Sequence, residues 1–264
     1  MSHPPPCSAL GRQCRELRLT LRIADFTEDS AAERDAAATW LLGHTERIAF
    51  GTPYRQEGLL LVDAVVRVGC KYLVPGSGGG EDGDGAVRCR AHGYEGGRPS
   101  ATRPSRVPAY RLSEDRFTVY HRGHVREMTL PVKTHRPRRL PVLQENPCAS
   151  ARCRTADNTI GAACCRDLTL DVVVPLGDER TELLLRSRRA PYLCKVKRTD
   201  ESVIEVEAIS ACGYLDPDDH VSCVLHERVL PDGTSAKPEI CFDWPDFDKD
   251  DEDFTGHPGC VFLT

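Results

Sequence analysis

The sequence predicts an α+β fold made of two related halves, with short strands and few helices, whose C-terminal half is organised around a cysteine-ligated metal site. Three observations predict it: segments in which apolar and polar residues alternate, as in strands; few segments with helix signals; and cysteine-anchored motifs that recur in both halves. We place the halves at residues 1–132 and 148–264, joined by a basic, proline-containing linker at 133–147.

The first half begins with signals for a strand, a helix and a second strand. Residues 14–26 alternate apolar and polar side chains and are predicted to form a half-buried strand. Residues 30–50 are predicted to form a helix, because Ser30 can cap its N-terminus, Glu33 stands at the capping-box position, and apolar residues follow at helical spacing. Residues 59–73 are rich in valine and leucine and predict a buried strand that runs into a cysteine.

A glycine-rich loop and a hairpin are predicted to complete the first half. The loop at 75–85 carries acidic residues where a phosphate-binding loop needs lysine and a hydroxyl residue, so we interpret it as a flexible connector. Residues 117–132 predict a hairpin that turns at Gly123.

The second half repeats the mixture of strands and a helix. Residues 168–174 and 202–209 are predicted to be strands, and 179–189 a short helix. The acidic run at 246–253 lacks the glycine turn and terminal glutamate of a calcium-binding loop, so we expect a solvated loop.

Composition indicates a soluble globular protein with an unusual number of cysteines. Of the 264 residues, 40% are hydrophobic and 28% charged, and the net charge of −5 predicts no nucleic-acid partner. No membrane span or secretory signal is evident, so we expect a cytoplasmic protein. In that reducing compartment, thirteen cysteines indicate metal binding more strongly than disulfides.

The two halves resemble one another around their cysteines. Three motifs recur in the same order: residues 14–19 resemble 165–170, 70–73 resemble 212–215, and 89–92 resemble 223–226. Residues 41–70 also align with 183–212 without gaps. We interpret this as an ancient duplication, the alternative being chance similarity among short motifs. The first copy is degenerate, because it keeps only part of the candidate ligand set: Cys14, Cys70, Cys89 and His92.

The second half concentrates the residues that suit a soft metal ion. Four thiolates, or three thiolates and an imidazole, complete a tetrahedral zinc shell, and four thiolates hold one iron–sulfur cluster. His226 follows Cys223 by three residues, so both would share one face if the segment were helical; a packing histidine is the alternative. Cys164 and Cys165 are adjacent, and adjacent side chains on an extended chain point apart, so we expect them to serve different sites, or one of them to pack.

The order of these motifs resembles the zinc- or iron-chelating domain family, which includes flagellin lysine N-methylases and many bacterial proteins of unknown role. The resemblance covers about residues 148–245 and rests on a cysteine set ending in a Cys-Cys pair, then the 212–215 and 223–226 motifs, then a Pro-x-x-Cys motif at 238–241. The leading cysteines are more widely spaced than in the family, and Lys237 stands where the family has arginine. The resemblance implies seven metal ligands: Cys148, Cys153, Cys164, Cys165, Cys212, Cys223 and Cys241. Cys194 and Cys260 fall outside these motifs, and each is predicted to be a packing or spare thiol.

Three functional hypotheses follow from the sequence. The first is a metal-binding module that holds zinc or iron, the latter alone or in an iron–sulfur cluster. The second is an iron or iron–sulfur enzyme with one coordination position open to substrate. The third is a thiol-redox or disulfide-bonded protein without metal. Whether the protein is an enzyme stays open, because the sequence contains no hydrolase elbow, zinc-protease motif, deaminase signature or dinucleotide fingerprint.

Overall fold

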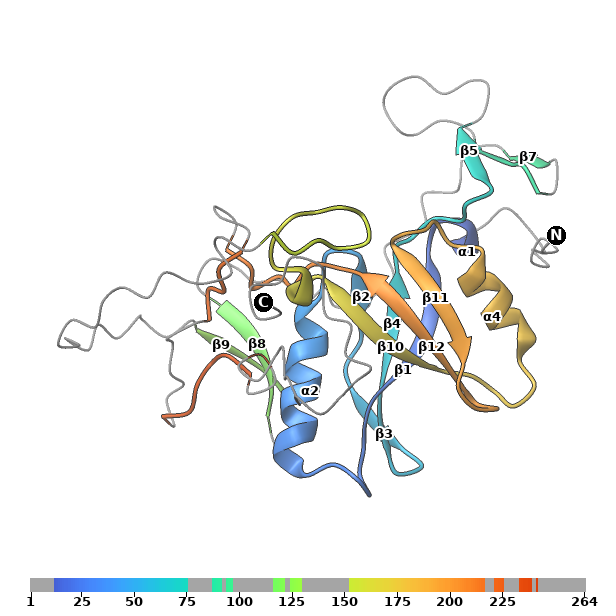
Figure 1. The fold of residues 1–264 in the computed structure, drawn as a ribbon. Coiled ribbons are helices and arrows are strands. Elements are labelled where there is room, and N and C mark those ends of the chain that lie inside the picture. The colour runs from blue at the N-terminus through green and yellow to red at the C-terminus, as the bar shows by residue number, and fades with distance from the viewer. Residues whose placement is uncertain are drawn as a thin grey trace, which may run out of the picture.

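The fold is a mixed α+β arrangement built around one antiparallel sheet (Figure 1). The computed structural model describes residues 12–75, 87–91, 94–96, 116–121, 124–129, 152–216, 221–225, 233–238 and 241. The sheet follows the order β11-β12-β10-β1-β4-β2, and β3 also pairs with β4. Its strands are β1 (Leu17–Asp25), β2 (Ile48–Phe50), β3 (Tyr54–Gln56), β4 (Leu59–Val66), β10 (Asp167–Val173), β11 (Leu193–Arg198) and β12 (Val203–Ile209). The predicted α+β class is confirmed.

The two halves of this sheet have the same strand order, if β1 is taken as the equivalent of β10, β4 of β12 and β2 of β11. In the first half β1 pairs with β4 and β4 with β2; in the second, β10 pairs with β12 and β12 with β11. The two halves meet where β1 pairs with β10. Each half contributes three strands to the path in the same order outward from this central pair, so the sheet has an approximate two-fold symmetry.

The register places the symmetry axis between Leu21 and Val172. These two residues are Cα partners, and the alignment that sets Cys14 on Cys165 also sets Leu21 on Val172. The outer pairing agrees as well. Leu17 pairs with Val66 in the first half and Leu168 with Ala208 in the second, at the positions that the sequence motifs make equivalent.

One hydrophobic core serves both halves. Alternate residues on the central strands, which lie on one face of a strand, are buried: Leu17, Leu19, Leu21, Leu168, Leu170 and Val172. Helix α2 (Ala31–Gly43) adds Leu41 and Leu42 to this core, and α4 (Glu179–Arg186) adds Leu184 and Leu185. Because side chains from both halves pack into one cluster, each half completes the core of the other.

Helix α2 begins where its capping box predicts. Glu33 N–H donates to the Ser30 hydroxyl oxygen, and the Glu33 carboxylate accepts from Ser30 N–H at 2.6 Å. The helix ends at Gly43, however, and residues 48–50 form strand β2, so the predicted helix at 30–50 was too long. The cause is that Ile48 and Phe50 extend the apolar pattern although they belong to an edge strand that pairs with β4.

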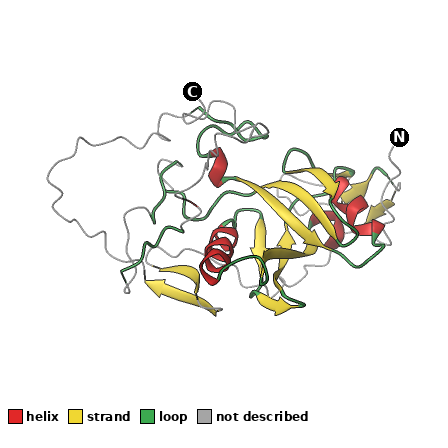
Figure 2. Cartoon of the chain, turned by 60° about the horizontal axis from the view of Figure 1, so that its bottom comes forward, coloured by secondary structure: helices red, strands yellow, loops and turns green. Residues whose placement is uncertain are grey.

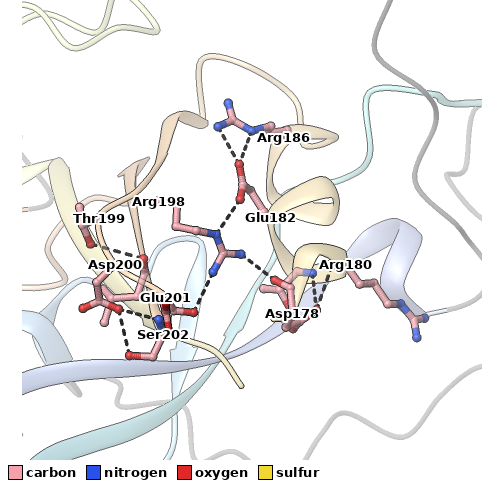
Figure 3. Close-up of polar contacts among 11 residues, drawn as sticks. Asp178, Arg180, Glu182, Arg186, Arg198, Thr199, Asp200, Glu201 and Ser202 are labelled. Atoms are coloured by element: carbon pink, nitrogen blue, oxygen red, sulfur yellow. Dashed lines mark hydrogen bonds and ion pairs between the residues drawn. The ribbon is translucent and has the colours of Figure 1, made fainter. Parts of the chain in front are cut away.

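Helix α4 is fixed at its N-terminus and tied to the β11–β12 hairpin by Arg198 (Figure 3). Asp178 caps the helix by accepting hydrogen bonds from the Arg180 and Thr181 N–H groups. Arg198 donates to the Asp178 carbonyl oxygen at 2.6 Å and forms an ion pair with Glu182 at 3.1 Å. The strands predicted at 14–26, 59–73 and 202–209 and the helix at 179–189 are confirmed with shorter bounds, and the strand predicted at 168–174 is confirmed one residue earlier, at 167–173.

Smaller elements surround this sheet. The predicted hairpin is confirmed as β8 (Arg116–His121) and β9 (His124–Thr129), beside α2 (Figure 2). There Thr39 and Tyr120 exchange two hydrogen bonds. Helix α1 (Arg12–Arg15) precedes β1, and β5 (Leu73–Pro75), β6 (Val87–Cys89) and β7 (Tyr94–Gly96) form a three-stranded sheet. Predictions for the linker at 133–147, the acidic run at 246–253 and loop residues 76–85 lie outside the described residues. Among the described helices, none is long and apolar enough to cross a membrane.

Candidate metal centre

The Cys164–Cys165 pair lies on a tight turn immediately before β10. A 3-10 turn, η1 (Ala163–Cys165), carries both residues, and Cys165 N–H donates to the Ala162 carbonyl at 2.9 Å. Gly161 has φ +81°, and a Cβ there would come within 2.7 Å of the Val221 side chain, so glycine permits this close approach. A hydrogen bond with the Cys165 side chain is the largest cause that raises the pKa of Cys164, followed by burial. The expectation that the two side chains point apart was wrong, because the chain here is turned rather than extended.

Cys212 and Cys223 lie on two loop segments that follow β12. Cys212 N–H donates to the Cys165 carbonyl at 2.9 Å, which joins this segment to the cysteine turn. Leu215 pairs with Cys223, and Val224 N–H donates to the Tyr214 carbonyl. Both cysteines pack against a small apolar cluster whose buried members are Tyr214, Leu225 and Ala236.

Electrostatic interactions connect these cysteines with Cys241. Burial raises the pKa of the Cys212 thiol to about 12; a backbone hydrogen bond from Tyr214 opposes this shift, and charge on Cys223 and Cys241 adds to it. Burial also raises the pKa of Cys241 to about 12, with further contributions from Cys223 and Cys164. We call these five residues the C-terminal thiol cluster: Cys164, Cys165, Cys212, Cys223 and Cys241.

A lysine supplies positive charge beside this cluster. Lys237 opposes the rise in the pKa of both thiols, but larger effects leave each pKa raised: the hydrogen bond with the Cys165 side chain and then burial for Cys164, and burial for Cys241. Cys241 N–H donates to the Pro238 carbonyl at 2.9 Å, which fixes the cysteine one turn beyond the lysine. A cation at this position favours the thiolate form that a metal ion requires.

The other predicted ligands are placed differently. Cys153 is buried in a small loop, where its carbonyl accepts from Gly161 N–H at 2.8 Å. Cys148 and His226 lie outside the described residues, and residues 223–225 form a bridge and a turn, so the helical spacing considered for Cys223 and His226 is absent from the described part. Cys194 lies on β11 opposite Glu207.

The C-terminal end of helix α2 packs against the C-terminal thiol cluster, a contact that the sequence analysis did not predict. A Cβ on Gly43 would lie 3.0 Å from the Tyr214 ring and 3.3 Å from Cys212 Sγ, and Gly213 N–H donates to the Gly43 carbonyl at 2.7 Å. The next residue, His44, is 1% exposed, and Ser210 donates to its carbonyl oxygen at 2.9 Å. These contacts join the first half to the cysteine loops of the second, and no local sequence signal reports a contact between such distant segments.

The donor chemistry of the cluster suits a thiophilic metal. All ten cysteines among the described residues are free thiols. Within the same residues, no three His, Cys, Asp or Glu side chains already have the arrangement of a metal site. Four segments carry the thiols, so an ion bound by them would hold together the turn before β10, the two loops after β12 and residue 241. No protein-family model matches the chain, and no curated protein or solved structure matches it either.

Proposed function

We propose that this protein binds zinc or iron through the C-terminal thiol cluster. The observation that carries the proposal is that Cys164, Cys212, Cys223 and Cys241 come from four segments and are linked by charge interactions between their thiols. Four thiolates satisfy a tetrahedral zinc shell or one iron–sulfur cluster. The motif order that resembles the zinc- or iron-chelating domain family supports the same assignment.

Metal binding also explains why thiols with raised pKa values are gathered in one place. Like charges close together are unfavourable, and burial adds to that cost. A divalent cation offsets both costs when it replaces the thiol protons. A thiol-redox role receives less support, because a thiol with a raised pKa is largely protonated near neutral pH, and the thiolate is the reactive form. A reducing compartment, for which we propose the cytoplasm, would keep these thiols available to metal.

Metal analysis of matched variants tests this proposal. Protein purified anaerobically from cells grown with iron and zinc is expected to contain near-stoichiometric metal, and Cys212→Ser and Cys241→Ser are each expected to remove most of the ion bound by the cluster. An absorption spectrum assigns the metal: visible thiolate-to-iron bands identify iron, and a colourless protein with zinc identifies a zinc site.

Cys194→Ser is the control, because Cys194 is partly buried like Cys212 and Cys241 but lies on β11 beside Glu207. It is expected to keep the metal content of the unchanged protein. Equal metal content in all three variants would show that the cluster does not bind the ion.

A further inference from the structure

The first half contains a counterpart of the C-terminal thiol arrangement, and we infer that it is a second metal site formed by Cys14, Cys70 and Cys89. This inference extends the proposed function to the other half of the molecule and rests on it. The two-fold symmetry of the sheet places these three residues where the second half has Cys165, Cys212 and Cys223.

The backbone joins the first two cysteines of each set by the same hydrogen bond. Cys70 N–H donates to the Cys14 carbonyl at 2.8 Å, and Cys212 N–H donates to the Cys165 carbonyl at 2.9 Å. The chain then turns identically in both halves. Leu73 N–H donates to the Cys70 carbonyl at 3.1 Å. Leu215 N–H donates to the Cys212 carbonyl, also at 3.1 Å.

The third cysteine of each set is held by the same backbone pairing. Leu73 pairs with Cys89 between β5 and β6, as Leu215 pairs with Cys223 in the second half. Arg90 N–H donates to the Tyr72 carbonyl at 2.9 Å, and Val224 N–H donates to the Tyr214 carbonyl at the same distance. Four matching backbone contacts therefore hold the three cysteines of each half in equivalent positions. We call the backbone around each set of three cysteines a cysteine frame.

The two frames also make reciprocal contacts with the helices. Lys71 N–H, which follows Cys70, donates to the Ser187 carbonyl at the end of α4. Gly213 N–H, which follows Cys212, donates to the Gly43 carbonyl at the end of α2. Each cysteine frame thus forms a backbone hydrogen bond with the C-terminal end of the helix in the opposite half, as a two-fold arrangement requires.

The three cysteines are buried but lie outside both hydrophobic clusters of the described residues. Cys14, Cys70 and Cys89 are only 5–6% exposed. Arg188, whose backbone pairs with Cys70, is also buried, and its guanidinium donates to the Leu184 and Val68 carbonyls.

The ligand class is the same soft divalent metal as in the second half. Three thiolates make up most of a tetrahedral shell for zinc or ferrous iron, and one further donor completes it. The site therefore predicts a metal stoichiometry of about two ions per chain, one in each half, if the second-half cluster holds a single ion.

Metal counting in four variants tests the second site. Elemental analysis of the anaerobically purified full chain is expected to give about two ions per chain, and about one in Cys70→Ser and in Cys212→Ser. The Cys70→Ser/Cys212→Ser double variant is expected to hold almost none, and the Cys194→Ser control to keep both. One ion that survives Cys70→Ser but is lost in Cys212→Ser would overturn this inference while leaving the proposed function intact. No metal in the unchanged protein would overturn both.

Alkylation of the unchanged protein gives a second measurement that needs no variant to fold. Thiol modification is mapped by mass spectrometry in native buffer before and after removal of metal by a chelator. Cys14, Cys70 and Cys89 are expected to react together, at least about tenfold faster after chelation, because metal-held thiolates are released. Cys194 serves as the internal reference. An unchanged rate at all three cysteines would show that they bind no metal.

Discussion

His44 is a histidine whose surroundings accommodate only the neutral imidazole. Its side chain is buried at the end of α2, and Nδ1 lies 2.8 Å from the Trp40 carbonyl, so this nitrogen carries the proton. Nε2 has no hydrogen-bond partner in the described part of the chain. Burial lowers the pKa of His44 to about 4, with a small opposing effect of the Trp40 hydrogen bond. Protonation would therefore place an unpaired charge in the interior.

This environment predicts that acid destabilises the protein through His44. The folded-state pKa lies below the ordinary value of 6.5, so the unfolded chain binds the proton more strongly. Stability is expected to fall as pH drops below about 6.5 and to level off below about 4, with a loss of about 2 kcal/mol between pH 7 and pH 5.

Urea unfolding at pH 7 and pH 5 measures this effect. The His44→Asn variant keeps a donor near the position of Nδ1 but has no titrating group, so its stability is expected to change less over this interval. The difference between the two proteins isolates His44 from other acid effects, including loss of metal. Equal pH dependence in both would show that His44 does not cause the loss.

At the scale of single elements, the Asp178 cap is the feature that starts α4. Its carboxylate accepts from the Arg180 and Thr181 N–H groups and from the Thr181 hydroxyl, and the last of these bonds is the largest cause of a lowered Asp178 pKa. The Asp178 carbonyl also accepts from Arg198, so the capping residue connects the helix to the β11–β12 hairpin (Figure 3).

Asp178→Ala is expected to lower the free energy of unfolding by about 1 kcal/mol, because it leaves N–H groups of the first turn without their acceptor. Glu179→Ala is the matched control: it removes the same charge from the same turn but none of the capping bonds, and is expected to cost only a few tenths of a kcal/mol. Urea denaturation followed by circular dichroism measures both. An equal loss in the two variants would attribute the effect to charge rather than to the cap.

Edge strand β11 is an example of an element that the sequence pattern failed to predict. No strand was predicted at 193–198, where Lys195, Lys197 and Arg198 interrupt the apolar pattern. Charged residues are common on edge strands, because they oppose pairing with other chains. The same residues that suit an edge therefore weaken the strand signal. The capping box of α2, by contrast, depends on residues close in sequence and was readable directly.

For the whole molecule, the sequence indicated the arrangement of the halves better than the details of the site. The motif alignment that sets Cys14 on Cys165 also sets Leu21 on Val172, and these two residues are Cα partners in the β1–β10 pair, as a duplicated sequence would predict. The approach of Gly43 to Cys212 could not be predicted, since it depends on how distant segments pack. The orientation of Cys164 and Cys165 was predicted wrongly, because a three-residue 3-10 turn has no distinctive sequence pattern.

The shared sheet leads to a prediction about cooperativity. β1 and β10 pair at its centre and both halves fill one core, so neither half can unfold without exposing apolar side chains of the other. We expect a single unfolding transition in urea, in which circular dichroism and tryptophan fluorescence change together.

Two substitutions on the symmetry axis, one from each half, test this cooperativity. Leu21 and Val172 are both fully buried, so Leu21→Ala is expected to cost about 3 kcal/mol and Val172→Ala about 2 kcal/mol. Both variants should shift the same transition. Arg18→Ala, on the opposite face of β1, is the exposed control and is expected to change stability by less than about 0.5 kcal/mol. Two separate transitions, each sensitive to only one of the buried substitutions, would show that the halves unfold independently despite the strand pairing that joins them.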